Sequence, residues 1–317
     1  MKSIISRLKE YPILFFFVKF SVFGLIIFLI DFSVGKTLKH FYFRQKSGFQ
    51  YRTTYSIGST KAEVLIFGSS RANHHYYPEV FEDSLKMSYY NCGRDGCSIL
   101  YHYSVLKSVL KRHQPKVVVL DLVMFEFIKN TESYDRLSAL FPYYDDHSEI
   151  RPIIHLKGEY EKYKFFSKIY PYNSSIFSIA VGNLESNKKR TEDRKGYLPN
   201  PYNWGRPITP GNLPIQYELD TNKIRCFENF LKDCLNKKIQ IFVFVSPKYV
   251  VMPGQDTSLA LGKQIAEKLG VKLYDYTEDK TFKSTVEWFG DMNHLNDKGA
   301  QVYSKIVVEK ILQNFKF

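Results

Sequence analysis

Two short polar stretches near opposite ends of the sequence carry residue types suited to nucleophilic chemistry. The first is Gly68-Ser69-Ser70-Arg71, which directly follows an apolar run at residues 64–67. Such a run predicts a buried parallel strand, and open α/β sheets bind their ligands at the carboxyl ends of such strands. A serine hydroxyl placed there becomes a nucleophile only when a base and a group that orients the base lie close to it.

The second stretch, Asp-Met-Asn-His-Leu at residues 291–295, supplies both of these groups. Asp291 and His294 are three residues apart in a predicted turn before the last helix, so the carboxylate and the imidazole can lie on one side of the chain. Because this turn follows the last predicted strand, we expect it at the same sheet edge as Ser70. We therefore predict Ser70 as nucleophile, His294 as general base and then general acid, and Asp291 as the residue that orients His294.

An attack on a carbonyl carbon also needs hydrogen-bond donors for the negative charge that develops on the carbonyl oxygen. We expect these donors to be the backbone N–H groups of Ser70 and Gly96, since a glycine lets the backbone approach a ligand closely. The alternative is that Ser70 merely caps a helix and that His294 begins one without any chemical role.

The rest of the sequence predicts a single large α/β domain at residues 62–317. Five strands are expected, at residues 62–68, 87–91, 117–120, 239–245 and 271–275, separated by helices at 78–85, 98–113, 218–236, 256–269 and 296–314. This alternation indicates right-handed parallel crossovers. We predict a three-layer α/β/α fold with a mostly parallel, five-stranded, flavodoxin-like sheet, in which residues 64–67 form the central strand.

Residues 129–217 interrupt this alternation with a stretch rich in Tyr, Pro, Asn and charged residues. The stretch is too long for an ordinary crossover, so we predict an insertion, partly helical at 157–184, that lies over the strand ends. Within it, Tyr197, Trp204 and Arg206 are candidates for contacts with sugar rings, with packing inside the insertion as the alternative. Arg71 is a further candidate for substrate binding, with a salt bridge to the fold as its alternative.

The N-terminal part of the chain has the character of a membrane anchor. Residues 13–30 are apolar apart from Lys19, Ser21 and Gly24, which is close to the length that spans a bilayer. We predict one transmembrane helix at residues 12–34, so that residues 1–35 form an anchor and residues 36–61 a juxtamembrane linker. The alternative is a buried helix of the domain. We expect the short N-terminus to stay in the cytoplasm and the large domain to be extracytoplasmic, or periplasmic.

The charge of the chain supports the same interpretation. The net charge is +13, and residues 1–62 contribute +8 of it, from ten Lys or Arg residues against Glu10 and Asp31. Positive charge beside an apolar segment is typical of attraction to anionic lipid headgroups. The remaining +5 has no nucleic-acid-binding motif to accompany it, so we expect no nucleic-acid partner.

Cysteine and histidine spacing points to no metal site, and we expect no cofactor. Cys226 and Cys234 lie in one predicted helix about 12 Å apart, too far for a disulfide. None of the cysteine spacings is typical of zinc, and the adjacent His74 and His75 lack the spacing of a ligand pair, so surface or cleft positions are favoured for them. Asp121 and Glu126, after the third strand, are expected to be structural or cleft residues rather than acids of the reaction.

Taken together, the motifs resemble those of the SGNH (GDSL) hydrolase family. Gly68-Ser69-Ser70 is similar to the Gly-Asp-Ser of its first block, Gly96 to the oxyanion glycine of its second, and Asp291-x-x-His294 to its last. The third block, Gly-x-Asn-Asp, has no counterpart, because residues 121–126 contain no Asn. The resemblance covers residues 62–128 and 218–314.

For a membrane-anchored member, the resemblance implies the SGNH hydrolase fold and an esterase or O-acyltransferase that works through an acyl-serine. It also implies an acylated carbohydrate substrate, such as O-acetylated envelope or surface polysaccharide. The absent Asn favours an alternative, a catalytically inactive binding protein that positions glycan or a membrane acyltransferase as its partner.

Overall fold

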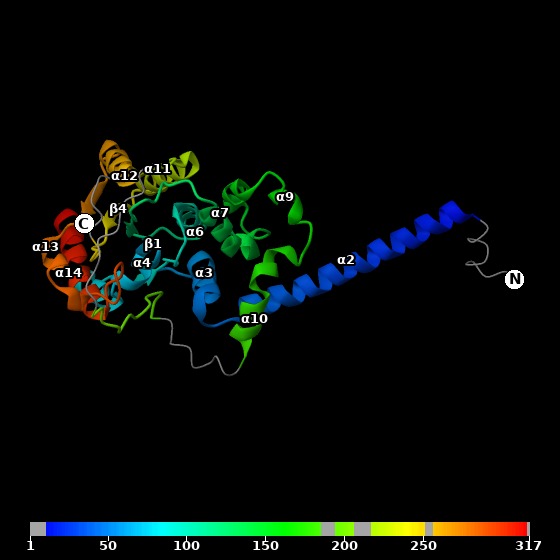
Figure 1. Ribbon diagram of the computed structural model, residues 1–317, viewed down its shortest axis with the longest axis horizontal. Helices are drawn as coiled ribbons and strands as arrows, with labels where there is room; N and C mark the ends of the chain where they lie inside the picture. The colour runs from blue at the N-terminus through cyan, green and yellow to red at the C-terminus, as the bar shows by residue number, and fades with distance from the viewer. Residues whose placement is uncertain (1–10, 185–193, 206–216, 251–255, 316–317) are drawn as a thin grey trace. The chain divides into compact units, whose positions relative to one another are not determined.

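The computed structural model describes residues 11–184, 194–205, 217–250 and 256–315. The chain divides into two compact units. We call the first, Met1–Gln45 with Gly158–Lys188, the helical unit, and the second, Lys46–Lys157 with Lys189–Phe317, the sheet unit. Each is described by itself below (Figure 1).

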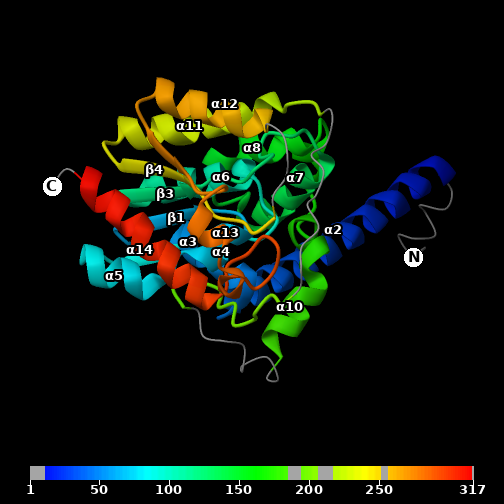
Figure 2. The same ribbon diagram turned by 60° about the vertical axis from the view of Figure 1, so that its left-hand side comes forward.

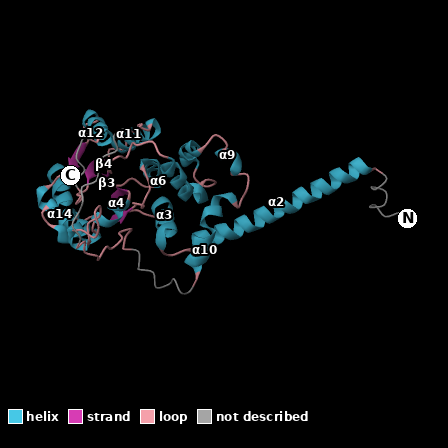
Figure 3. Ribbon diagram, in the orientation of Figure 1, coloured by secondary structure: helices cyan, strands magenta, loops and turns pink. Residues whose placement is uncertain are grey.

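The sheet unit is built on five parallel strands in the order β2-β1-β3-β4-β5. The strands are β1 (Val64–Gly68), β2 (Tyr89–Asn91), β3 (Val117–Asp121), β4 (Gln240–Val245) and β5 (Lys272–Asp275), shown in magenta in Figure 3. The predicted five-stranded flavodoxin-like sheet is confirmed. The prediction that residues 64–67 form the central strand is wrong, because β2 is added on one side of β1 and the later strands on the other, which leaves β3 in the centre.

Helices cover both faces of this sheet, as the predicted three-layer fold requires (Figure 2). One face carries α4 (Ser70–His75), α5 (Pro78–Leu85) and α14 (Asp297–Asn314), and the other carries α6 (Ile99–Arg112), α11 (Thr221–Asn236) and α12 (Thr257–Lys268). Val64 and Ile66 belong to the core cluster of α5 and α14, whereas Phe67 points the other way and meets Phe230 of α11 at 5.3 Å between ring centroids. Burial on both faces explains why β1 and β3 are continuous apolar runs.

Most of residues 36–61, the predicted juxtamembrane linker, is helical. Helix α2 (Pro12–Arg44) continues past the apolar segment, and α3 (Gly48–Gly58) packs on α6 in the sheet unit. The hydroxyl of Thr53 is hydrogen-bonded to that of Tyr101 at 2.8 Å, and the Arg112 guanidinium donates to the carbonyl groups at the end of α3. The polar residues that suggested a linker are thus partners of the core.

The predicted insertion at residues 129–217 is divided between the two units. Its first part packs near α6 and comprises α7 (Thr131–Asp135), η1 (Arg136–Tyr143), η2 (Ser148–Ile150), α8 (Arg151–Ile154) and η3 (His155–Lys157). Its second part, α9 (Glu161–Lys164), η4 (Tyr170–Ser175) and α10 (Ile176–Asn183), belongs to the helical unit. After these, residues 194–205 lie beside α4 and the start of α14, where the Leu198 N–H donates to the Asn73 carbonyl at 2.9 Å. Two short elements, α13 (Lys280–Lys283) and η6 (Val286–Trp288), precede α14.

Helix α2 has the length and composition of a membrane-spanning helix. It is 33 residues long, and its most apolar window has a mean hydropathy of 2.8. None of that window is covered by other parts of the protein, which does not fit the alternative of a buried domain helix.

Candidate active site

The turn after β1 displays Ser70 at the carboxyl end of the strand. Gly68 has a φ of +142°, and a Cβ atom there would lie 2.8 Å from the Asp121 carbonyl oxygen and 2.9 Å from the Ala72 Cβ. Only glycine fits between β1 and β3 in this conformation. Helix α4 then begins at Ser70 itself, beside the point where the strand order reverses between β1 and β3, which is the usual ligand position in this type of sheet.

Three side chains from the two predicted stretches form one chain of hydrogen bonds. The Ser70 Oγ lies 2.7 Å from the His294 Nε2, and the His294 Nδ1 lies 2.9 and 2.8 Å from the Asp291 Oδ1 and Oδ2. A carboxylate can only accept, so the Nδ1 carries the proton and the Nε2 is left to accept from the serine hydroxyl. This tautomer is the one that can take a proton from Ser70.

The local turn keeps Asp291 ionised and fixed. Its Oδ1 accepts from the backbone N–H groups of Asn293 at 2.7 Å and His294 at 2.9 Å. Partial burial would raise the pKa of Asp291, but the hydrogen bonds from the His294 ring and these two amides outweigh burial and hold the pKa below its usual value. The spacing of three residues is what lets one carboxylate accept from both the ring and the backbone of the same histidine.

His75 is a positioning residue that the sequence did not reveal. Its ring is fully buried on α4, and its Nε2 accepts from the Leu295 N–H at 2.9 Å, directly after His294. Burial, followed by the nearby His294, Arg71 and His74, lowers the pKa of His75 well below its usual value, so the ring stays neutral and the Nε2 remains an acceptor. Two adjacent histidines gave no signal for this role, because the partner is a backbone group far away in the sequence.

Arg71 takes part in a buried polar cluster behind the nucleophile rather than facing an open cleft. Its Nε lies 3.7 Å from the Asp121 Oδ1, and the Asp121 Oδ2 accepts from the hydroxyls of Tyr76, at 2.6 Å, and Ser246. Burial raises the pKa of Asp121 even though Arg71 and the two hydroxyls act in the opposite direction. Arg71 thus pairs with a buried carboxylate of the neighbouring strand.

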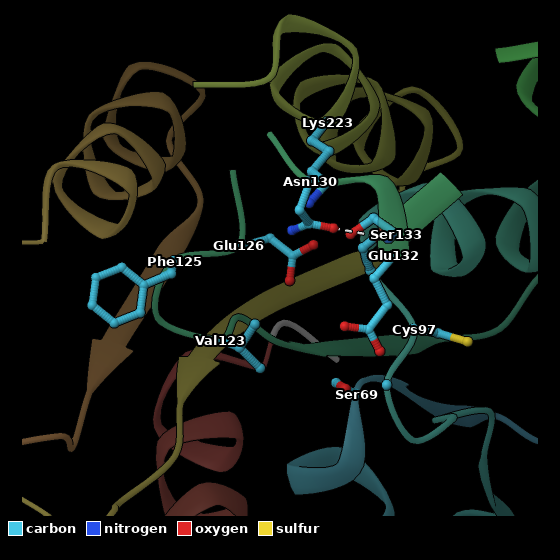
Figure 4. Close-up of a pocket in the computed structure, with 11 residues that line it drawn as sticks. Ser69, Cys97, Val123, Phe125, Glu126, Asn130, Glu132, Ser133 and Lys223 are labelled. Carbon is cyan, nitrogen blue, oxygen red and sulfur yellow. Dashed lines mark hydrogen bonds between the residues drawn. The ribbon is translucent and has the colours of Figure 1, made fainter. Parts of the chain in front are cut away.

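Gly96 lines a cavity of about 210 Å³ that Ser69 also lines (Figure 4). Gly96 has a φ of +69°, and a Cβ atom there would lie 3.2 Å from the Arg136 guanidinium carbon. The other walls come from the loop before α6, the turn after β3, α7 and α11. The lining is Ser69, Gly96, Cys97, Ser98, Val123, Phe125, Glu126, Asn130, Glu132, Ser133 and Lys223.

Glu126 is the most perturbed acid of this cavity. Its Oε1 accepts from the Ile99 N–H, the first of α6, at 2.7 Å, and its carboxyl group reaches into the cavity in Figure 4. Burial raises the pKa of Glu126 to about 7, although the Ile99 amide and Lys223 favour the ionised form. Together with Asn130, Glu132 and Lys223, this carboxyl group makes the lining of the cavity polar.

Of the three residues of the insertion that were candidates for contacts with sugar rings, the two that the structure describes differ in their burial. Tyr197 is 1% exposed and its hydroxyl donates to the Asp297 Oδ1 at 2.6 Å, so its ring packs inside the protein. Trp204 is half-buried against the core cluster of α14. Arg206 lies outside the described residues.

Neither a disulfide nor a candidate metal-ligand group is found among the described residues. Cys92, Cys97, Cys226 and Cys234 are all buried and free. Among the described ranges, no group of three or more His, Cys, Asp or Glu side chains has the geometry to hold a metal ion.

Comparisons with known proteins give likenesses in structure alone. No protein-family model and no curated protein matches the sequence. Among solved structures, the psychrotrophic esterase EstA from Pseudoalteromonas sp. matches with 12% identity and a TM-score of 0.40, covering 79% of this chain and 98% of its own. An acetyl xylan esterase, AlAXEase, matches with 14% identity and a TM-score of 0.37, covering 80% of this chain and 100% of its own.

Proposed function

We propose that this protein is a membrane-anchored serine esterase or O-acyltransferase of the SGNH type. The observation that carries this proposal is the unbroken chain of hydrogen bonds from Ser70 through His294 to Asp291. The three groups come from stretches more than two hundred residues apart, so their meeting is a property of the fold rather than of local sequence.

In the first half of the reaction, the Ser70 Oγ attacks the carbonyl carbon of an ester while the His294 Nε2 takes the hydroxyl proton. The ionised Asp291 stabilises the imidazolium that results. Negative charge on the carbonyl oxygen is met by the backbone N–H groups of Ser70 and Gly96. When the tetrahedral intermediate collapses, the imidazolium protonates the departing alcohol and the acyl group stays on Ser70.

In the second half, a hydroxyl compound attacks the acyl-serine and His294 takes its proton. Water as the attacking compound gives an esterase, whereas a sugar hydroxyl gives an O-acyltransferase. The same three residues serve both outcomes, and the difference depends on whether the cleft excludes water and binds an acceptor.

The proposed substrate is an acylated, in particular O-acetylated, polysaccharide of the cell envelope or surface. Two features support it: an apolar helix suited to holding the enzyme at a membrane, and a polar cavity beside Ser69 that suits a hydroxylated group. The resemblance of the motifs to the SGNH family supports the ester chemistry.

Acetate release tests the proposal. The full chain in mild detergent is incubated with O-acetylated polysaccharides, with and without deacetylated oligosaccharide as acceptor, and free and transferred acetate are both measured. We expect release or transfer that disappears in Ser70→Ala and persists in Ser69→Ala. Equal turnover by wild type and Ser70→Ala would contradict the proposal.

The absence of an Asn at residues 122–126, directly after β3, favours a second candidate, a protein that binds glycan or a membrane acyltransferase without turnover. Residues 122–126 supply no amide side chain for a third oxyanion donor. This candidate predicts that glycan binding survives in Ser70→Ala while wild type shows no acyl-serine.

A further inference from the structure

We propose that residues 160–166 of the helical unit form an aromatic surface that inserts into the lipid headgroup region beside the membrane-spanning part of α2. The inference rests on the proposed anchor and goes beyond it, because it assigns a second, separate contact with the bilayer. It names the lipid bilayer, rather than a protein, as the occupant of this surface.

Hydrogen bonds to Asp31 set the position of this segment along α2. The Asp31 carboxylate accepts from the Ser167 hydroxyl at 2.5 Å and from the backbone N–H groups of Lys168 at 2.6 Å and Ile169 at 3.3 Å. At Gly35, a Cβ atom would lie 2.4 Å from the Lys168 backbone, so the two segments are in contact with no side chain between them. Residues 167–169 are therefore fixed against α2 at the level of Asp31.

The depth of Asp31 in the bilayer follows from the length of the apolar run that precedes it. The apolar run at residues 13–30 is about 27 Å long as a helix, close to the ~30 Å thickness of the hydrocarbon core. Asp31 is the first charged residue after the run, and Lys36 and Lys39 follow within three turns. Asp31 thus marks the boundary between hydrocarbon and headgroups, and the three donors from residues 167–169 satisfy its carboxylate without water.

The aromatic side chains at positions 160, 163 and 166 lie on one side of the segment. The Tyr163 N–H donates to the Tyr160 carbonyl and the Phe166 N–H to the Tyr163 carbonyl, at 3.1 and 3.2 Å. Hydrogen bonds between residues three apart place every third side chain on one face. Glu161 and Lys164 form the next face, and there the buried Glu161 accepts from Lys164 at 3.0 Å and from the Tyr170 hydroxyl.

The aromatic face is left open to the surroundings. Tyr160, Tyr163 and Phe166 are 66%, 53% and 81% exposed. Tyrosine and phenylalanine rings at the hydrocarbon boundary, with lysines beside them, are the composition that membrane interfaces favour. Lys162, beside the Tyr163 ring, supplies positive charge for anionic headgroups.

Phe177 is a matched control for Phe166, because it is equally exposed in the same unit but belongs to a helix that contacts α2 farther from Asp31. Phe177 of α10 is also 81% exposed, but α10 meets α2 near its C-terminal end, where the Asn183 side chain donates to the Phe41 carbonyl at 3.0 Å (Figure 1). Phe41 is ten residues past Asp31, which is about 15 Å farther along the helix. The proposal therefore expects lipid contact at Phe166 and not at Phe177.

Fluorescence quenching in vesicles tests this directly. The full chain, carrying Phe166→Trp, Phe177→Trp or Phe23→Trp, is reconstituted into phosphatidylethanolamine and phosphatidylglycerol vesicles. The acyl chains carry bromine either near the headgroups or near the bilayer centre. The signal of Trp204 and Trp288 is subtracted with the unsubstituted protein.

We expect Phe166→Trp to lose roughly half of its emission to the shallow bromine and less to the deep one, as an interfacial ring should. Phe23→Trp should show the reverse order and Phe177→Trp little quenching by either. Quenching of Phe23→Trp without quenching of Phe166→Trp would overturn the inference while leaving the anchor in place. Quenching of neither would overturn both, and equal shallow quenching of Phe166→Trp and Phe177→Trp would contradict the assignment to residues 160–166.

Discussion

At the scale of single residues, the central feature is a histidine whose two ring nitrogens have different partners. The Asp291 carboxylate holds the proton on the His294 Nδ1, and the Ser70 hydroxyl faces the Nε2. The roles that we propose for all three residues depend on this tautomer.

Asp291→Asn should lower kcat by about 10²- to 10⁴-fold with little change in KM. The Asn Oδ1 can still accept from the backbone of Asn293 and His294, so the turn is kept. The Asn Nδ2 would face the His294 Nδ1 as a donor, which favours the wrong tautomer. Steady-state kinetics on a chromogenic ester checks this, and an unchanged melting temperature serves as the control. Wild-type kcat in this variant would contradict the role of Asp291.

Glu126 gives a prediction about stability and pH. Its pKa is raised from 4.5 to about 7 by burial, so the folded protein binds this proton more tightly than the unfolded chain. Wild-type stability should therefore fall as the pH rises from 4.5 to about 7 and change no further above that value for this group. Glu126→Gln, which can still accept from Ile99, should not show this loss.

The measurement is urea unfolding of both proteins in mild detergent across this range. Relative to wild type, Glu126→Gln should gain about 1 to 3 kcal/mol in unfolding free energy between acidic and mildly alkaline pH. A difference between the two proteins that does not vary with pH would show that Glu126 is not perturbed.

At the scale of elements, the turn between β1 and α4 depends on the absence of a side chain at Gly68. Gly68→Ala should destabilise the sheet unit by about 2 to 4 kcal/mol, since a Cβ atom would meet Asp121 and Ala72 and the positive φ is strained. Gly270→Ala is the matched control, because Gly270 also has a positive φ but has nothing within 4 Å of the added atom.

Calorimetric melting of both variants measures the difference. We expect Gly270→Ala to lose only about 1 kcal/mol, the cost of the backbone conformation alone. Similar losses in the two variants would mean that the close approach of β1 and β3 at Gly68 is unimportant.

The sequence predicted well those elements whose residue pattern reflects a single physical cause, such as burial on both faces of a strand. Strands β1, β3 and β4 are buried on both faces, so their apolar runs marked them clearly. Helix α14 was marked by the turn before it, whose Asn296 side chain caps the helix by accepting from Gly299. The closeness of Ser70, His294 and Asp291 was predictable because parallel strands end at one edge.

The elements that sequence predicted poorly have partners distant in the chain. The polar sequence of α3 resembles a linker, but Arg112 and Tyr101 of α6 bind its polar groups in the structure. Residues 167–169 of the predicted insertion pack on α2 through Asp31, a contact that no periodicity encodes. His75 was missed for the same reason, because it binds a backbone amide near the other end of the sequence.

At the scale of the whole molecule, we propose that the sheet unit lies outside the cytoplasm and that α2 is its single membrane helix. Lys2, Arg7 and Lys9 precede α2, which favours a cytoplasmic position for that end of the helix, and long domains cross membranes largely regardless of their charge. In a bacterial host, alkaline phosphatase fused after Phe317 should therefore be active, because it needs the disulfides of an oxidising compartment. β-Galactosidase fused at the same point should be inactive. The reverse pattern would place the domain in the cytoplasm.

The central claim is that Ser70 is a nucleophile activated by His294 and Asp291, and labelling with a fluorophosphonate tests it most directly. This reagent forms a covalent bond with an activated serine oxygen, and intact mass with peptide mapping locates the adduct. We predict one adduct on Ser70 in wild type and in Ser69→Ala, none in Ser70→Ala, and labelling at least about 10²-fold slower in His294→Ala. Equal labelling of wild type and Ser70→Ala, or no labelling of either, would contradict the claim.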